Sequence, residues 1–303
     1  TFWVNLPDFT SSIESLQVQR GVGTSTNGSG AFGASINILT DAVSENANAE
    51  ISNSLGSYNT RKHTVKFSTG KINQFFELSG RLSKIDSDGY VDRAYSDLKS
   101  YFLQASFQKG NTFLKALSFG GHEKTYQSWY GLTMDQVLEN RRQNPYTYEN
   151  EIDNYKQDHY QFHWKQKLNP NWSANVGLNY TYGRGYFEQF REDDSVDTYS
   201  GIVLSDIDKN GNNTGTVDLI RRRWLDNNFY VFNSSLIYNK NRFNISLNSS
   251  FSKYSGDHFG EVIWARQLNE NSSIRDKYYQ GLGKKTEYSF FTKASYLFEN
   301  NLE

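Results

Sequence analysis

The side chains best suited to bind a ligand are arginines and aromatic rings at the borders of polar stretches. Arg221, Arg222 and Arg223 stand where a long polar stretch returns to a strand-like pattern. Guanidinium groups bind anions through charge-assisted hydrogen bonds. Tyr126, Trp129 and Tyr130 begin another polar stretch, and their rings could stack on a planar ligand. Alternatively, the arginines are solvated loop charges, and the aromatic residues belong to an interface between apolar and aqueous surroundings.

Three other motifs have competing interpretations. Gly28–Gly33 reads G-x-G-x-x-G, but the alternating segment 35–40 follows where a dinucleotide site needs a helix, which favours a loop. The segment 206–211 begins like an EF-hand, yet Val217 occupies the twelfth position, so an Asx-rich turn or a structural cation remain alternatives. His159 and His163 share one face of a strand, which leaves a haem or metal role open.

No catalytic set accompanies these residues. Neither paired carboxylates nor a Ser, His and Asp set occur at motif spacing, so we expect no enzyme activity and no cofactor. There is no cysteine, which excludes disulfides and thiolate metal sites. With 32 basic and 33 acidic residues, the chain has no global positive charge that would attract nucleic acid.

Composition and alternation predict an all-β protein. Among 303 residues there are 21 Tyr, 21 Phe and 6 Trp, a balance that favours strands. Apolar and polar residues alternate clearly in 172–182 and 243–252, and also in 100–108, 159–168 and 288–298. A period of two places alternate side chains on opposite faces of a sheet.

The connections between these segments alternate between short and long. Tight turns are predicted at 71–73, 109–111, 169–171, 239–241 and 299–301, and longer polar stretches at 86–97, 127–156, 187–224 and 254–284. An up-and-down barrel in an outer membrane has short periplasmic turns and long external loops. We therefore expect about ten strands of a transmembrane antiparallel β-barrel, with an eleventh strand starting at Asn301. Because an unpaired edge is not tolerated in lipid, we expect the closing strands to lie beyond this sequence.

Residues 12–38 resemble the end of the plug domain of TonB-dependent outer-membrane receptors. The shared elements are a Ser-Ile-Glu start at 12–14, Arg20-Gly21, the glycine-rich loop 28–33, and the Ser-Ile-Asn-Ile segment 35–38 just before the first barrel strand. Segments 155–160 and 223–228 resemble siderophore-type receptors of Bacteroidetes. The resemblance predicts the C-terminal part of a plug domain in residues 1–45 and the N-terminal half of the barrel in residues 46–303.

This resemblance implies active import of a scarce nutrient, most simply a ferric siderophore or another iron complex, through a plugged barrel of about 22 strands. Its implied location is the outer membrane of a Gram-negative bacterium. The implied partners are a small-molecule chelate, membrane lipid and lipopolysaccharide, and the TonB-ExbB-ExbD system, reached through a Ton box outside this sequence. The alternatives are a glycan, peptide or cobalamin receptor of the same family, or a passive porin-like or adhesin barrel. The predicted ligand-binding residues are Arg20, Asn27, Phe32, Tyr126, Trp129, Tyr130, Tyr186, Arg221, Arg222 and Arg223.

Overall fold

A computed structural model describes residues 5–21 and 33–298, and strands dominate it. A two-stranded sheet contains β1 (Ile13–Arg20) and β2 (Ala34–Thr40). A ten-stranded sheet contains β3 (Asn48–Gly56), β4 (Thr60–Ser68), β5 (Phe76–Ser87), β6 (Ser96–Lys109), β7 (Thr112–Tyr126), β8 (Ile152–Lys167), β9 (Trp172–Ser195), β10 (Thr216–Lys240), β11 (Phe243–Ala265) and β12 (Lys277–Tyr296). The prediction of an all-β chain with about ten antiparallel strands is confirmed.

Helices are few and short. The α-helix α1 (Met134–Asn140) lies in the β7–β8 connection, and the 3-10 helices η2 (Phe9–Ser12) and η3 (Val196–Tyr199) lie near the N-terminus and in the β9–β10 connection. No helix among the described residues is both long and apolar enough to cross a membrane.

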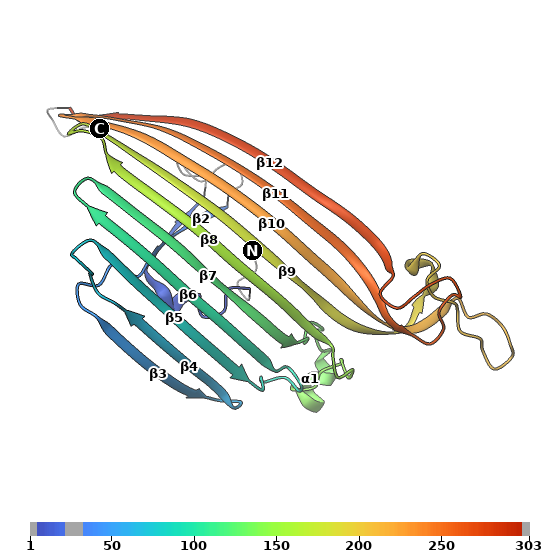
Figure 1. The fold of residues 1–303 in the computed structure, drawn as a ribbon. Helices are drawn as coiled ribbons and strands as arrows, with labels where there is room; N and C mark the ends of the chain where they lie inside the picture. The colour runs from blue at the N-terminus through green and yellow to red at the C-terminus, as the bar shows by residue number, and fades with distance from the viewer. Residues whose placement is uncertain (1–4, 22–32, 299–303) are drawn as a thin grey trace.

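Every strand of the large sheet is antiparallel to the next strand in the sequence, so the sheet is an uninterrupted meander from β3 to β12. Figure 1 shows the strands running obliquely side by side, with tight turns at one end and elaborate connections at the other. Two of the tight turns join Lys109 to Thr112 and Lys240 to Phe243, as predicted from the sequence. The predicted turn at 299–301 lies outside the described residues.

The two faces of the large sheet differ. The hairpin β1–β2 lies behind the sheet in Figure 1, and we call the face that it covers the inward face. Contacts between the sheets confirm this arrangement: Thr40 Oγ1 donates to Gln104 Oε1 at 3.1 Å, and Lys115 Nζ donates to Thr40 Oγ1 at 2.6 Å. The side chains opposite this covered face form the outward face.

Cross-strand pairs on the outward face form a broad apolar band. Phe162, Leu178 and Phe232 make one row across three strands, and a row of tyrosines, Tyr160, Tyr180 and Tyr230, lies beside it. Apolar side chains here are exposed, among them Leu82 at 62% and Phe290 at 80%. On β9 the band runs from Trp172 to Tyr182. At about 3.3 Å per residue and a tilt of about 40°, that segment rises roughly 25 Å.

The strands extend well past this band. The stretches 187–224 and 254–284 were expected to be loops, but β9 continues to Ser195, β10 begins at Thr216, β11 ends at Ala265 and β12 begins at Lys277. The expectation was wrong because apolar and polar residues stop alternating between the faces beyond Tyr182, where Tyr186 points outward and Phe187 inward, while the backbone ladder continues. The true connections are residues 196–215 and 266–276, which we call the loop lobe.

Candidate ligand-binding site

The three consecutive arginines of β10 do not act as one group. Arg222 lies on the outward face, where its Nε donates to Glu188 Oε2 at 2.8 Å and its guanidinium lies over the Tyr186 ring at 4.3 Å. Arg221 and Arg223 lie on the inward face, because neighbouring residues of a strand point to opposite sides.

Arg221 links β10 to the loop lobe and to the end of β9. Its guanidinium donates to Tyr199 Oη and to Gln189 Oε1, both at 3.2 Å, and lies 3.6 Å from Asp194 Oδ2. Tyr199 is completely buried, and burial raises the pKa of its hydroxyl, so it remains a neutral donor to Asp194 at 2.6 Å. Arg221 therefore has a structural role in the lobe.

Arg223 differs because its side chain is exposed and makes no ion pair with a described residue. Its Nε donates to Tyr279 Oη at 3.2 Å, and the guanidinium carbon lies 5.5 Å and 5.6 Å from the ring centres of Phe187 and Tyr279. Trp129 meets Phe187 edge to face at 5.4 Å and is 55% exposed. Trp129, Phe187, Arg223 and Tyr279 form what we call the arginine–aromatic cluster.

The sheet itself positions this cluster. Cross-strand pairing joins Phe187 to Arg223 and Gly260 to both Arg223 and Tyr279, so the three side chains share one row on the inward face. A Cβ at Gly260 would collide with the rings of Tyr278 and Tyr279. The absence of a side chain therefore lets both rings approach the strand closely at Gly260.

A hydrophobic core in the loop lobe fixes the ends of these strands. Buried Tyr199, Ile202, Val217, Leu219 and Val262 pack together, with Val203 and Tyr278 completing the cluster. In Figure 1 the lobe lies beyond the ends of β9–β12. These connections are therefore packed structures, which hold the arginine–aromatic cluster in place.

The β7–β8 connection delivers Trp129 to the cluster. Its helix α1 starts with a capping box at Thr133, where the side chains of Thr133 and Gln136 bond each other's backbone N–H groups. Buried Asn144 donates to Gln127 O and Asp92 O, both at 3.0 Å, which ties the connection to the β5–β6 loop. Glu151, 2% exposed, accepts from Phe190 N at 3.0 Å, and burial raises its pKa to about 7.

The other predicted ligand-binding residues are dispersed. Tyr126 is buried, and its hydroxyl donates to Tyr148 O at 2.7 Å. Tyr130 packs against Tyr146 at 5.0 Å, and Tyr186 lies on the outward face beside Trp224. Arg20 is exposed at the end of β1. Asn27 and Phe32 lie outside the described residues. Among the predicted residues that the structure describes, Trp129 and Arg223 come into one cluster through Phe187 on the inward face, and Arg222 and Tyr186 meet on the outward face.

Sequence reasoning missed Phe187 and Tyr279. The signal for Phe187 was present, since strict alternation from Thr181 through Gly183 and Gly185 places it on the inward face. Nothing in the sequence marked Tyr279, because a register shift at Gly260–Glu261 alters which face its neighbours occupy.

The alternative motifs have local structural explanations. His159 stacks on Phe119 with ring centres 4.6 Å apart, and its Nδ1 lies 3.0 Å from Thr181 Oγ1. Asp208 Oδ1 accepts from the N–H groups of Asn210 and Asn212, both at 2.8 Å, as in an Asx-rich turn. Over residues 5–21 and 33–298, no group of three His, Cys, Asp or Glu side chains is arranged to hold a metal ion.

A buried ion pair joins the N-terminal segment to the inward face. Arg81 Nη1 donates to Asp8 Oδ2 at 2.7 Å, and both side chains are at most 3% exposed. Lys62 and Ser83 also donate to Asp8, each at 2.5 Å. Phe9 stacks on Phe119 at 4.9 Å. The segment before β1 is therefore docked on the wall of the large sheet.

Comparison with known proteins shows the fold. No family model and no curated protein matches this sequence. Among solved structures, the ferric-catecholate import receptor Fiu of E. coli K12 is similar at 12% identity, over 94% of this chain and 47% of Fiu, with a TM-score of 0.65. The siderophore receptor PiuA of Acinetobacter baumannii is similar at 11% identity, over 93% and 45% of the two chains, with a TM-score of 0.67.

A copper transporter, OprC, is similar at 10% identity, over 94% of this chain and 41% of OprC, with a TM-score of 0.66. The chain thus spans less than half of each of these proteins. The fold that the plug motif predicted, that of TonB-dependent receptors, is confirmed. At this level of identity the likeness does not determine the ligand.

Proposed function

We propose that this chain is part of a TonB-dependent outer-membrane receptor that imports an iron complex. Residues 1–45 would form the C-terminal part of the plug, and residues 46–303 the first half of the barrel. The docking of Asp8 and Thr40 on the inward face supports this division, because a plug lies inside the barrel wall. Import would be energised by the TonB-ExbB-ExbD system.

The outward face supports a place in the outer membrane of a Gram-negative bacterium. Its apolar band rises roughly 25 Å, which matches the lipid-facing band of outer-membrane barrels. Trp172 packs on Tyr238 at one border, and Tyr160, Tyr180 and Tyr230 stack near the other. Aromatic rings favour both interfaces of a bilayer. The loop lobe would then face the exterior.

The arginine–aromatic cluster is the observation that carries the choice of ligand. An exposed guanidinium that lies over two rings, with Trp129 packed against one of them, suits an anionic ligand with planar aromatic groups, since charge attraction and stacking act on the same molecule. A ferric chelate with aromatic oxygen donors has these properties. The cluster faces inward at the loop end, where a ligand from outside would first meet the barrel.

The test is growth and uptake in the host strain, with and without the complete gene. Under iron limitation, each chelate of a panel of ferric siderophores, haem and cobalamin is supplied in turn, and uptake of the labelled ligand is measured with TonB present and absent. We expect one aromatic, anionic ferric chelate to depend on both the gene and TonB. Uptake that continues without TonB would instead support a passive barrel, and rescue by no iron complex would rule out the proposed ligand class.

A further inference from the structure

Two glycines in the middle of β12 lie on the inward face of the sheet. Cross-strand pairing joins Gly281 to His258 and Gly283 to Gly256, in the two rows next to that of Arg223. Neither of these β12 glycines has a positive φ. Glycine weakens a strand interior, because it loses more freedom on folding than any other residue and has no side chain to pack. We call Gly281 and Gly283 the glycine strip.

Other inward-facing glycines make room for aromatic rings. A Cβ at Gly183 would collide with Tyr155 Oη, and Gly260 has the same role in the arginine–aromatic cluster. The glycine strip differs from both. Among the described residues other than its chain neighbours, none has a heavy atom within 4 Å of a Cβ built at Gly281, and the nearest atom to one at Gly283 is 3.8 Å away. The described part of the sheet therefore has room for a side chain at both positions.

A cation stands near each end of the glycine strip. The next inward residues of β12 are Tyr279 on the loop side and Lys285 on the other side, about 20 Å apart along the strand. Lys285 is 68% exposed, although its Nζ also lies 3.1 Å from Glu287 Oε2. At the loop end, Arg223 donates to Tyr279 Oη and makes no ion pair with a described residue. An anion over the strip would therefore meet positive charge at both ends.

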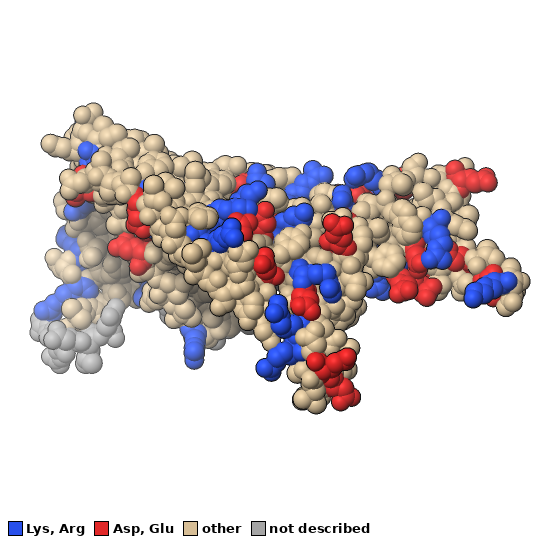
Figure 2. All heavy atoms as spheres, turned by 90° about the horizontal axis from the view of Figure 1, so that it is seen from below, with Lys and Arg blue, Asp and Glu red and all other residues tan. Residues whose placement is uncertain are grey.

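Long-range charge does not select a ligand at the loop end. On the face that Figure 2 shows, basic and acidic side chains are interspersed over this end, at the right of the view. The formal net charge of the chain is only −1. Without a broad field of one sign, selection depends on short-range contacts, to which the shape of the wall contributes.

We propose that the glycine strip is a specificity-determining part of the ligand site, where a planar group of the ligand lies against the bare backbone of β12. Carbon atoms in contact are about 3.5–4.0 Å apart, so a flat ring can come this close to a strand only where no Cβ intervenes. A ligand bound by Arg223 would extend from the Tyr279 ring over the strip. This inference rests on the proposed function, because it concerns the same ligand, an anionic ferric chelate with planar aromatic groups.

The first experiment maps the glycine strip by cysteine labelling of the full-length protein in detergent. These 303 residues contain no cysteine, so Gly281→Cys introduces the only thiol in this part of the chain. Labelling by a water-soluble maleimide is timed with and without iron(III) tris(catecholate), a trianion with three planar rings. With this probe at about ten times its dissociation constant, labelling of Gly281→Cys should slow about tenfold. The control is Lys209→Cys, in an exposed turn of the loop lobe, and its labelling should not change.

The second experiment separates a ligand contact from a structural role. Gly281→Val fills the strip, so the affinity of the full-length protein for the probe should fall about 10- to 100-fold. The free energy of unfolding should stay unchanged, because the position is open. Gly183→Val is the matched contrast. Tyr155 lies over Gly183, so this variant should be less stable than the natural protein.

Equal labelling of Gly281→Cys with and without the probe, or an unchanged affinity of Gly281→Val, would overturn the proposal. So would the absence of probe binding by the natural protein. A Gly281→Cys thiol that does not react in the ligand-free protein would also overturn it, as would a loss of stability in Gly281→Val as large as that in Gly183→Val. Either result would show that a side chain from another part of the full-length protein covers the strip.

The same variants are tested for TonB-dependent uptake, which separates the two claims. If the natural protein imports aromatic ferric chelates but the strip variants bind them normally, only this inference fails. If the probe protects the strip but no iron complex is imported, only the proposed function fails.

Discussion

The guanidinium of Arg223 is the exposed inward-facing cation of the arginine–aromatic cluster, and its loss should weaken ligand binding. A hydrogen bond to a charged group contributes about 1.5–3 kcal/mol, so we expect Arg223→Ala to lower the affinity for an anionic chelate by about 10- to 100-fold. Arg223→Lys should recover part of that loss, because the charge remains while the planar fork is absent. Equilibrium binding of the chelate to the full-length protein measures both effects.

The matched control is Arg222→Ala, one residue away. Arg222 faces outward and bonds Glu188, so its removal should leave chelate affinity unchanged. A loss of affinity that is equal in the two variants would show that β10 is disturbed generally, and that Arg223 has no direct contact with the ligand.

Glu151 offers a pH-dependent test of the β7–β8 connection. Burial raises its pKa from 4.5 to about 7. Between these two pH values the Glu151 carboxyl keeps its proton in the folded state but has lost it in the unfolded state. The free energy of unfolding therefore falls as the pH rises from about 4.5 to about 7, and it levels off above pH 7. Glu151→Gln should be more stable than the natural protein above pH 7, by at most about 3 kcal/mol, and no more stable near pH 4.5.

The measurement for Glu151 is hydrogen exchange of the amides in 141–152 at pH 5 and pH 8, corrected for intrinsic rates. The glutamine oxygen can still accept from Phe190 N, so the substitution removes the charge and keeps that hydrogen bond. If the natural protein and Glu151→Gln exchanged these amides at the same rate at pH 8, ionisation of the Glu151 carboxyl would not lower the stability of the connection.

Sequence patterns at the residue scale identified the right side-chain types but not their faces. The triplet 221–223 was considered as one anion-binding group, whereas strand alternation separates Arg222 from its neighbours and the lobe engages Arg221. Alternation was available in the sequence and could have singled out Arg222. The involvement of Arg221 depends on Tyr199 and Asp194, which reach it only through the packing of the lobe.

At the scale of elements, the sequence predicted the halves of β9 to β12 that carry the apolar band and missed their loop-side halves. Segments 172–182 and 243–252 alternate because one face is apolar, and they lie in β9 and β11 as expected. Past Arg184 aromatic and polar residues occur on both faces, as Tyr186 and Phe187 show, so no period of two remains to be read. Main-chain hydrogen bonds, which any sequence can make, continue the sheet there.

The β5–β6 and β7–β8 connections hold each other, and Arg93 is the main link. Its Nε and Nη2 donate to Tyr146 O at 3.0 and 2.7 Å, and Nη2 also donates to Asn144 O at 2.7 Å. Since each bond contributes about 1 kcal/mol, Arg93→Ala should increase exchange of the amides in 141–150 about tenfold or more. Hydrogen exchange with mass spectrometry measures this change.

Arg141→Ala is the control for Arg93→Ala. Arg141 is exposed at the end of α1, so its substitution removes one positive charge from the β7–β8 connection without removing a link between the two connections. It should leave exchange in 141–150 unchanged. Trp129 depends on the ordered connection, so Arg93→Ala should also weaken chelate binding, although it touches no residue of the arginine–aromatic cluster. Unaltered exchange in the Arg93 variant would show that the two connections are ordered independently.

For the whole molecule, one sheet with two unlike faces accounts for the proposed lumen and for the proposed lipid-facing surface. The inward face carries polar side chains, a docked hairpin and a hollow of about 560 Å³ lined by small polar residues such as Asn175, Asn233 and Ser250. The outward face carries the apolar band. Because successive residues alternate between these faces, a single residue step moves a side chain from the proposed lumen to the proposed lipid.

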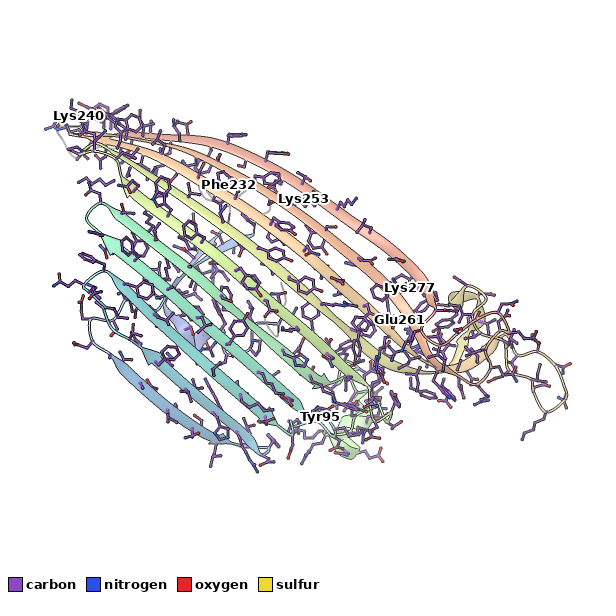
Figure 3. The ribbon with its side chains drawn as sticks, in the orientation of Figure 1. Tyr95, Phe232, Lys240, Lys253, Glu261 and Lys277 are labelled. Atoms are coloured by element: carbon purple, nitrogen blue, oxygen red, sulfur yellow. The ribbon has the colours of Figure 1, made fainter. Side chains whose placement is uncertain are left out.

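Adjacent residues of β10 test this arrangement directly. Phe232, labelled in Figure 3, lies outward near the middle of the band, and Asn233 lies inward in the hollow. An arginine facing lipid at mid-bilayer costs about 2–4 kcal/mol, so Phe232→Arg should lower the free energy of unfolding of the full-length protein in lipid vesicles by that amount. Asn233→Arg should change this free energy little, because the hollow can admit the arginine side chain and water.

The free energies of unfolding are measured by reversible urea unfolding, followed by tryptophan fluorescence. Equal costs at the two positions would contradict a lipid-facing band, and a larger cost at Asn233 would reverse the assignment of the faces.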